Sequence, residues 1–93
     1  MKTQVGTLIQ TNGQAFTVRP YNGKKFSLTE LQGFVGGDIE LVRMKRGNGR
    51  GTMYVNGEGK LKDLAPNQAA TKIADIDGDI IVGPVIIVRV EGH

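Results

Sequence analysis

The chain has 93 residues, no cysteine, a single histidine and a formal net charge of +3. This length fits one domain, residues 1–93, and the lack of cysteine excludes a disulfide scaffold, a Cys nucleophile and Cys-based metal sites. The histidine, His93, is the last residue, so neither a catalytic His nor a cluster of His ligands is expected. The mild positive charge favours anionic partners without being a signature of nucleic-acid binding.

Leu, Ile, Val and Phe make up 26 of the 93 residues, which is enough for a folded core. Because one small domain buries little apolar surface, we expect a homo-oligomer. The opening residues, Met1-Lys2-Thr3-Gln4, lead into no sustained apolar stretch, so no signal peptide is expected. Residues 80–88 form the longest apolar run, which is too short to span a bilayer. We therefore expect a soluble, cytoplasmic protein without a membrane partner.

The first third of the chain predicts a hairpin. Residues 5–10 and 14–19 predict two strands around Thr11-Asn12-Gly13, because Asn-Gly tolerates the positive φ of a tight turn. Pro20 ends the second strand, and Tyr21-Asn22-Gly23 predicts a further turn.

A short helix is expected over residues 27–35. Ser27 can cap it, with Glu30 three residues later as the reciprocal member of a capping box. Gly36-Gly37 then ends it. The apolar residues at helical spacing, which predict its buried face, are Leu28, Leu31 and Val35.

The middle of the chain predicts a second hairpin. Residues 38–44 and 52–56 predict its two strands on either side of the basic tract 45–50. Residues 60–64 are expected to form a short extended piece.

A second helix is expected over residues 66–74, followed by a loop over 75–79. Residues 80–90 predict the last strand, which is apolar on both faces in its first half and so should lie centrally in the sheet. Pro84 cannot donate a ladder hydrogen bond, which implies a bulge or bend. The expected fold is α+β: a mostly antiparallel sheet of two hairpins and a buried C-terminal strand, with two short helices.

The basic tract offers the first candidate site. Lys45, Arg46 and Arg50 alternate with glycines, and such a loop can hold phosphate through its cations and its free backbone N–H groups. The alternative is a flexible, solvated hairpin tip. The tract is neither a Walker loop nor a dinucleotide-binding glycine motif, because neither pattern is present.

The second candidate site follows directly. Asn56 and Glu58 could read a base or ribose edge, and Lys60 and Lys62 could meet phosphate as point charges. Asn67 completes this polar set. The alternatives are that Asn56-Gly57-Glu58-Gly59 is only a turn and that Asn67 only caps the second helix.

The remaining motifs carry less chemistry. The acidic run 75–79 lacks the ligand spacing and the bidentate Glu of a calcium loop, so a plain turn is expected and no metal or cofactor. Tyr54 leaves the basic tract and could stack on a base. The three phenylalanines, by contrast, are expected in the core: Phe16, Phe26 and Phe34. No carboxylate forms a recognisable catalytic pair, so an enzyme is not expected.

Four stretches carry a family resemblance: L-Q-G-F-V-G-G-D-I-E at 31–40, Y-V-N-G-E-G-K-L at 54–61, L-A-P-N-Q-A at 64–69 and D-I-I-V-G-P-V at 79–85. In order and spacing they resemble a family of small proteins of phages and bacterial mobile elements that is classed as a domain of unknown function. The basic, glycine-rich loop 45–51, which contains the basic tract, is longer and more charged than this resemblance requires. A phage setting implies, by analogy of class, a sponge that binds a host immune signal without cleaving it.

The leading hypothesis is therefore a non-enzymatic oligomer that binds a phosphorylated nucleotide-like ligand, such as a cyclic nucleotide or an ADP-ribose-type signal. The phosphates would meet the cations, and the recognition of base or ribose would fall to the amides, Glu58 and Tyr54. The alternatives are a nucleic-acid-binding module, a protein–protein inhibitor of a host defence factor, and an enzyme acting on nucleotides.

Overall fold

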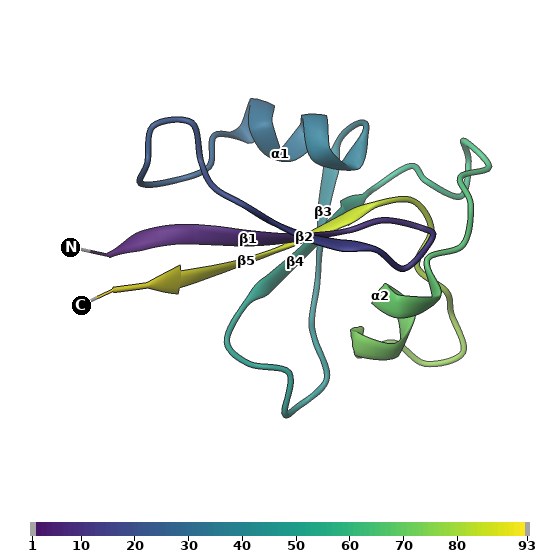
Figure 1. Cartoon of the computed structure of the whole chain (residues 1–93). Helices are drawn as coiled ribbons and strands as arrows, with labels where there is room; N and C mark the ends of the chain where they lie inside the picture. Colours follow the sequence, from purple (N-terminus) through teal and green to yellow (C-terminus); the bar gives the residue numbers. More distant parts are fainter. Residues whose placement is uncertain (1, 93) are drawn as a thin grey trace.

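Five antiparallel strands form a single sheet in the order β2-β1-β5-β4-β3. They belong to a computed structural model that describes residues 2–92 (Figure 1). The predicted α+β class is confirmed. In chain order the elements are β1 (Thr3–Ile9), β2 (Ala15–Val18), α1 (Leu28–Val35), β3 (Ile39–Val42), β4 (Thr52–Asn56), α2 (Gln68–Ile73) and β5 (Val85–Glu91).

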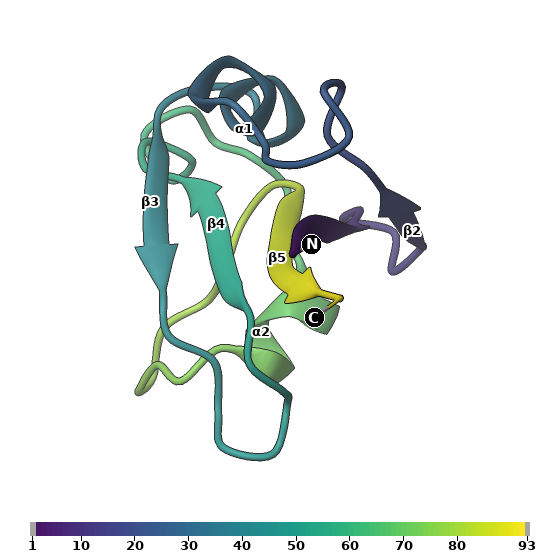
Figure 2. The same ribbon diagram turned by 90° about the vertical axis from the view of Figure 1, so that its left-hand side faces the viewer.

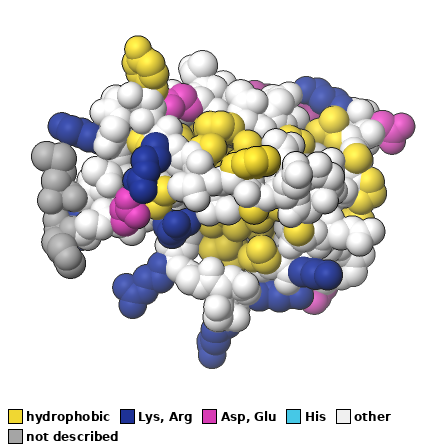
Figure 3. Space-filling model, in the orientation of Figure 1, with side chains coloured by type: hydrophobic (Ala, Val, Ile, Leu, Met, Phe, Trp, Pro, Cys, Tyr) yellow, Lys and Arg dark blue, Asp and Glu magenta, His cyan; other side chains and the backbone are white. Residues whose placement is uncertain are grey.

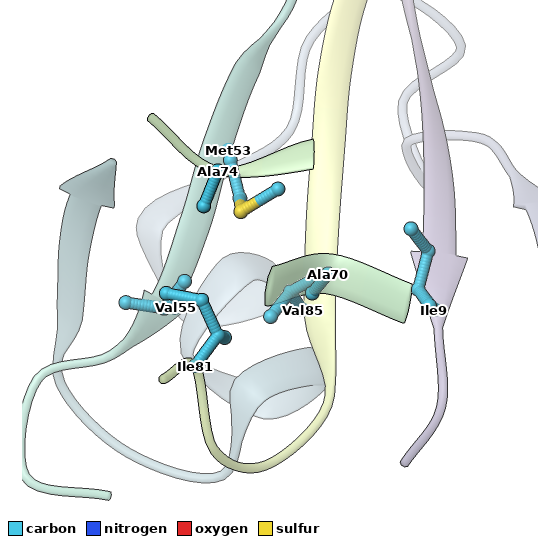
Figure 4. Packing of buried hydrophobic residues seen from close by; sticks show 7 residues of the cluster. All are labelled: Ile9, Met53, Val55, Ala70, Ala74, Ile81 and Val85. Carbon is cyan, nitrogen blue, oxygen red and sulfur yellow. The ribbon is translucent and has the colours of Figure 1, made fainter. Parts of the chain in front are cut away.

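The two helices lie on opposite faces of the sheet, so the protein has three layers (Figures 1 and 2). On one face, the apolar side of α1 packs on β5. The buried residues of this cluster are Phe26, Leu31, Val35, Ile86 and Val88. On the other face, α2 covers a second cluster (Figure 4), whose buried residues are Ile9, Met53, Val55, Ala70, Ala74, Ile81 and Val85. Since alternate residues of a strand point to opposite faces, β4 and β5 contribute to both clusters.

Local sequence signals explain where α1 begins and ends. The Ser27 hydroxyl accepts a hydrogen bond from the Glu30 backbone N–H at 3.1 Å, and a Glu30 carboxylate oxygen accepts one from the Ser27 N–H at 2.9 Å. This is the predicted capping box. The helix ends at Gly36, whose φ of 83° is the left-handed conformation that a glycine adopts without strain.

The last strand lies at the centre of the sheet, as predicted, between β1 and β4. It begins at Val85, however, and not at residue 80. Residues 81–83 instead bond to the segment that precedes α2: the Asn67 N–H donates to the Ile81 carbonyl and the Gly83 N–H to the Ala65 carbonyl. The bend expected at Pro84 thus lies between two kinds of pairing: residues 81–83 pair with the segment before α2, and β5 pairs within the sheet.

Three other expectations are wrong. Leu28 is not on the buried face of α1, because it is 58% exposed at the first turn of the helix. Residues 60–64 are not extended, because they wind into consecutive turns in which the Lys62 and Leu64 N–H groups donate back to Glu58 and Gly59. Phe16 is not in the core: its residue is 48% exposed, since it lies on the edge strand β2, away from the strands that α1 covers. Phe26 is buried as predicted, and Phe34 packs edge-on against it.

Residues 2–92 contain no helix that is long and apolar enough to cross a bilayer. His93, on which the exclusion of histidine chemistry partly depends, lies outside the described residues.

Candidate functional site

The nine candidate residues do not form one site. Arg50 and Tyr54 line a groove on the α1 face of the sheet, with a volume of about 440 Å³. Three others line a smaller pocket, of about 190 Å³, on the α2 face: Asn56, Glu58 and Lys60. The remaining four line neither cavity: Lys45, Arg46, Lys62 and Asn67.

The α1-face groove is built by three neighbouring strands, β1, β5 and β4. In their register Gln4 lies opposite Val90, and Thr52 lies opposite Val88. Paired residues of antiparallel strands share a face, so these side chains lie on the same side as α1. The groove is the part of this face that α1 leaves open, and the residues that line it are Lys2, Gln4, Arg50, Thr52, Tyr54, Val88, Arg89, Val90 and Gly92.

Gly51 brings Arg50 close to the groove. A Cβ at this position would lie 2.8 Å from Ile87 Cγ2 and 3.2 Å from the Val88 carbonyl oxygen. Only a residue without a side chain lets the end of the basic tract approach β5 this closely. Gly51 therefore lets the end of the basic tract lie against β5, next to the groove.

The groove is electropositive. Lys2 and Arg50 contribute cationic side chains, and none of the lining residues that the structure describes carries a carboxylate side chain. The Arg89 guanidinium is directed elsewhere, because it donates to the Thr7 hydroxyl at 3.0 Å and Thr7 belongs to the α2 face. Glu91 follows Val90 on the strand and so points to the opposite face, where it is paired with Arg19 at 2.5 Å. In Figure 3, many Lys and Arg side chains lie at the left and lower margins, toward the chain ends and the β3–β4 hairpin.

The tip of the β3–β4 hairpin projects beyond the sheet (Figure 2). Its first arm is held to the end of α2, since the Lys45 N–H donates to the Ile73 carbonyl at 2.7 Å and the Asp75 N–H to the Arg43 carbonyl at 2.8 Å. Lys45 and Arg46 are exposed. Neither residue lines the groove, whereas Arg50 does.

On the α2 face, the candidate polar groups already have partners. The Lys60 ammonium forms an ion pair with Asp79, and this hydrogen bond, with another from the Ile80 N–H, lowers the pKa of the Asp79 carboxyl below its ordinary value of 3.8. Asn56 lines the pocket, but it has the same parity as Tyr54 on β4, so its side chain turns to the α1 face. There the buried amide donates to the Val35 carbonyl at 3.1 Å and accepts from the Glu58 N–H at 2.8 Å. Lys62 is exposed in the neighbouring turn.

Asn67 is completely buried and holds three segments together. Its side-chain N–H₂ group donates to the carbonyls of Ile9 and Gly83, each at 3.0 Å, and its oxygen accepts from the Ala70 N–H at 3.0 Å. Because both donations of this amide go to backbone carbonyls, Asn67 has a structural role and is not part of the candidate site. It caps α2, which is the alternative that the sequence offered.

Sequence reasoning missed Lys2, Gln4, Val88 and Val90, which complete the groove. The alternation of residues along the first and last strands would have placed them on one face, but only the β1–β5 and β5–β4 registers bring that face beside Tyr54.

Among the described residues, no group of three or more acidic or histidine side chains is arranged to hold a metal ion.

A search of curated proteins and a search of solved structures each find no match. One family model, described as "Domain of unknown function (DUF3846)", matches residues 4–93, so the match includes the N-terminal hairpin as well as the four stretches singled out in the sequence. By this match over nearly its whole length, the chain belongs to the DUF3846 family of domains of unknown function.

Proposed function

We propose that this protein binds a phosphorylated nucleotide-like ligand in the α1-face groove and holds it without converting it. The observation that carries the proposal is the lining of the groove within residues 2–92: two cationic side chains, a tyrosine and two valines, with no carboxylate. Its volume of about 440 Å³ falls within the range of small-molecule sites, roughly 300–1,000 Å³.

Each lining group suits one part of such a ligand. The Arg50 guanidinium can donate to two phosphate oxygens at once, and the Lys2 ammonium can approach phosphate as a point charge. Tyr54 is half-buried, and its ring together with Val88 and Val90 offers a surface on which a base can lie. Binding without conversion is consistent with the described part of the lining, in which no Asp, Glu, Cys or His could act as a general base or nucleophile.

The biological use that we propose is sequestration of a cyclic-nucleotide or ADP-ribose-type immune signal in the cytoplasm of a bacterial host, by an anti-defence protein of phage or mobile-element origin. This part of the proposal is supported by analogy with other small, basic proteins that bind such signals. The groove is open along the sheet, and exposed Leu41 and Val90 lie on the same face, so a second copy packed there would cover the ligand. A homo-oligomer is therefore part of the proposal.

Isothermal titration calorimetry with cyclic AMP and with ADP-ribose tests the site. Losing two charge-assisted hydrogen bonds, at about 1.5 kcal/mol each, should weaken binding about 100-fold in Arg50→Glu. Lys72→Glu is the matched control, because it makes the same charge change on exposed α2, across the sheet from the groove, and should bind as the unchanged protein does. Equal affinities in both variants would refute the groove assignment.

Native mass spectrometry of the protein from cells that make such signals tests the absence of conversion, since a bound ligand should be released with its mass intact. A processed ligand would instead indicate an enzyme. Affinity for single-stranded DNA that falls steeply with salt would indicate a nucleic-acid module, because phosphate contacts release counterions. A stable complex with one host protein and no bound small molecule would indicate a protein inhibitor.

A further inference from the structure

The α2-face pocket has a chemistry unlike that of the groove. Its floor is apolar and opens onto the core cluster beneath α2, where Val55 and Ile81 lie side by side (Figure 4). No residue of α2 lines it, because this six-residue helix ends before it covers the β3 side of the sheet. The pocket is therefore a gap in the cover of a buried apolar cluster.

The rim of the pocket is acidic. Three carboxylates line it, and of these only Asp79 has an ion-pair partner, Lys60, among residues 2–92. Glu40 and Glu58 are both exposed, and both line the pocket. The pocket thus combines a small apolar interior with two carboxylates that have no ion-pair partner in the described part of the chain.

Size and charge limit what such a pocket can take. Its volume of about 190 Å³ is well below the roughly 300 Å³ at which sites for drug-sized ligands begin, so it encloses a side-chain-sized group and not a nucleotide. A phosphate would be repelled by the unpaired carboxylates, whereas a cationic nitrogen would be attracted to them. A short alkyl chain would bury apolar surface against the valines and isoleucines of the floor.

We propose that this pocket binds a small organic cation: an alkylammonium or alkylguanidinium ligand whose chain lies on Val55 and Ile81 and whose head lies between Glu40 and Glu58. The arrangement resembles the way in which a lysine stem covers apolar surface while its ammonium stays at the water boundary. The Lys60–Asp79 ion pair joins the two loops on either side of the pocket and keeps the rim in place. This site is independent of the phosphate site on the other face.

Titration of methyl-labelled protein with n-pentylammonium, followed by ¹H–¹³C NMR, tests the proposal. The expected result is a saturable shift of the Val55 and Ile81 methyl signals. The neutral isostere 1-pentanol should bind more weakly, by a factor of up to about five, because only the ammonium is attracted by the carboxylates. Pentanoate, which is negatively charged, should not bind. This ligand series uses the unchanged protein, so it does not depend on any variant folding.

Substitutions then locate the charge. The double variant Glu40→Gln with Glu58→Gln should bind pentylammonium no more tightly than 1-pentanol. Asp63→Asn is the matched control: Asp63 is exposed in the same turn, has a φ of 57° that Asn also tolerates, and does not line the pocket. It should leave the fivefold preference intact, as should Arg50→Glu on the opposite face.

Three results would overturn the proposal. The first is equal affinity for pentylammonium and 1-pentanol, or undiminished ammonium preference in the double variant. The second is the absence of a saturable shift at these methyl groups. The third is a shift of the same signals with protein concentration alone, which would mean that the basic hairpin of a second copy, and not a small cation, occupies the pocket.

Discussion

Replacing Asn67 by alanine should destabilise this protein more than any exposed polar substitution, because one buried amide joins β1, α2 and the loop before β5. Three hydrogen bonds disappear: the cap of the Ala70 N–H, and the donations to the Ile9 and Gly83 carbonyls. Losing an N-cap costs about 1 kcal/mol. Each buried carbonyl left without its donor adds about 1 kcal/mol more, so the total is about 3 kcal/mol.

That loss is large for a domain of this size, whose free energy of unfolding should be roughly 5–14 kcal/mol at about 0.05–0.15 kcal/mol per residue. Urea unfolding followed by circular dichroism measures it. With a slope of about 1–3 kcal/mol per molar urea, the midpoint should fall by roughly 1–3 M. Asn67→Ser should recover about 1 kcal/mol, because a serine can cap the helix but cannot also reach both carbonyls.

Asn48→Ala is the control, since Asn48 also donates from its amide to a carbonyl, that of Lys45, but lies exposed at the hairpin tip. Its effect should stay within about 0.5 kcal/mol. If Asn67→Ala were as mild as this control, the role assigned to the buried amide would be wrong. If Asn67→Ala folded normally but lost nucleotide binding, Asn67 would return to the candidate site as a ligand contact.

Three further outcomes are expected. Gly6→Ala should lower the free energy of unfolding, measured in urea, by about 1–3 kcal/mol, because its Cβ would lie 2.8 Å from Ile86 Cδ1. Gly33→Ala, inside α1 with no atom within 4 Å of the new Cβ, should instead stabilise by about 0.5–1 kcal/mol, and the reverse order would contradict the packing described here. Hydrogen bonds from the Ser27 and Tyr21 backbone lower the pKa of Glu30 from its ordinary value of 4.5, so its contribution to stability is present above that pH and is lost as the pH falls through the lowered pKa. Thermal unfolding between neutral pH and pH 3 should therefore depend less on pH in Glu30→Gln than in the unchanged protein.

Most of the secondary structure could be read from the sequence, because it follows from local rules. Asn12-Gly13 predicts the first hairpin, Ser27 with Glu30 predicts the start of α1, and the apolar run near the C-terminus predicts a central strand. The errors arise where neighbours outweigh local preference. Residues 80–84 look like strand, but the segment 65–67 takes their hydrogen bonds, and residues 60–64 close into turns.

Which candidate residues lie together could not be read from the sequence in the way that the secondary structure could. The sequence placed cations, amides and Tyr54 within 23 residues of each other, from 45 to 67, yet the sheet divides them. Because side chains alternate along β4, Tyr54 faces α1, whereas Val55 faces α2. Arg50 therefore lines the same groove as Lys2, which lies two strands away, and Lys60 pairs with Asp79 in a pocket on the other face. Asn67 is buried at the start of α2.

The sequence by itself thus determined three things: the set of helices and strands, the central position of the last strand, and the lack of cysteine and the scarcity of histidine. Which residues meet was decided by strand register, by the parity of positions along β4 and β5, and by the short length of α2. These are relations between segments far apart in the chain, and no local pattern encodes them. The separation of an electropositive groove from an acidic, apolar pocket is their direct consequence.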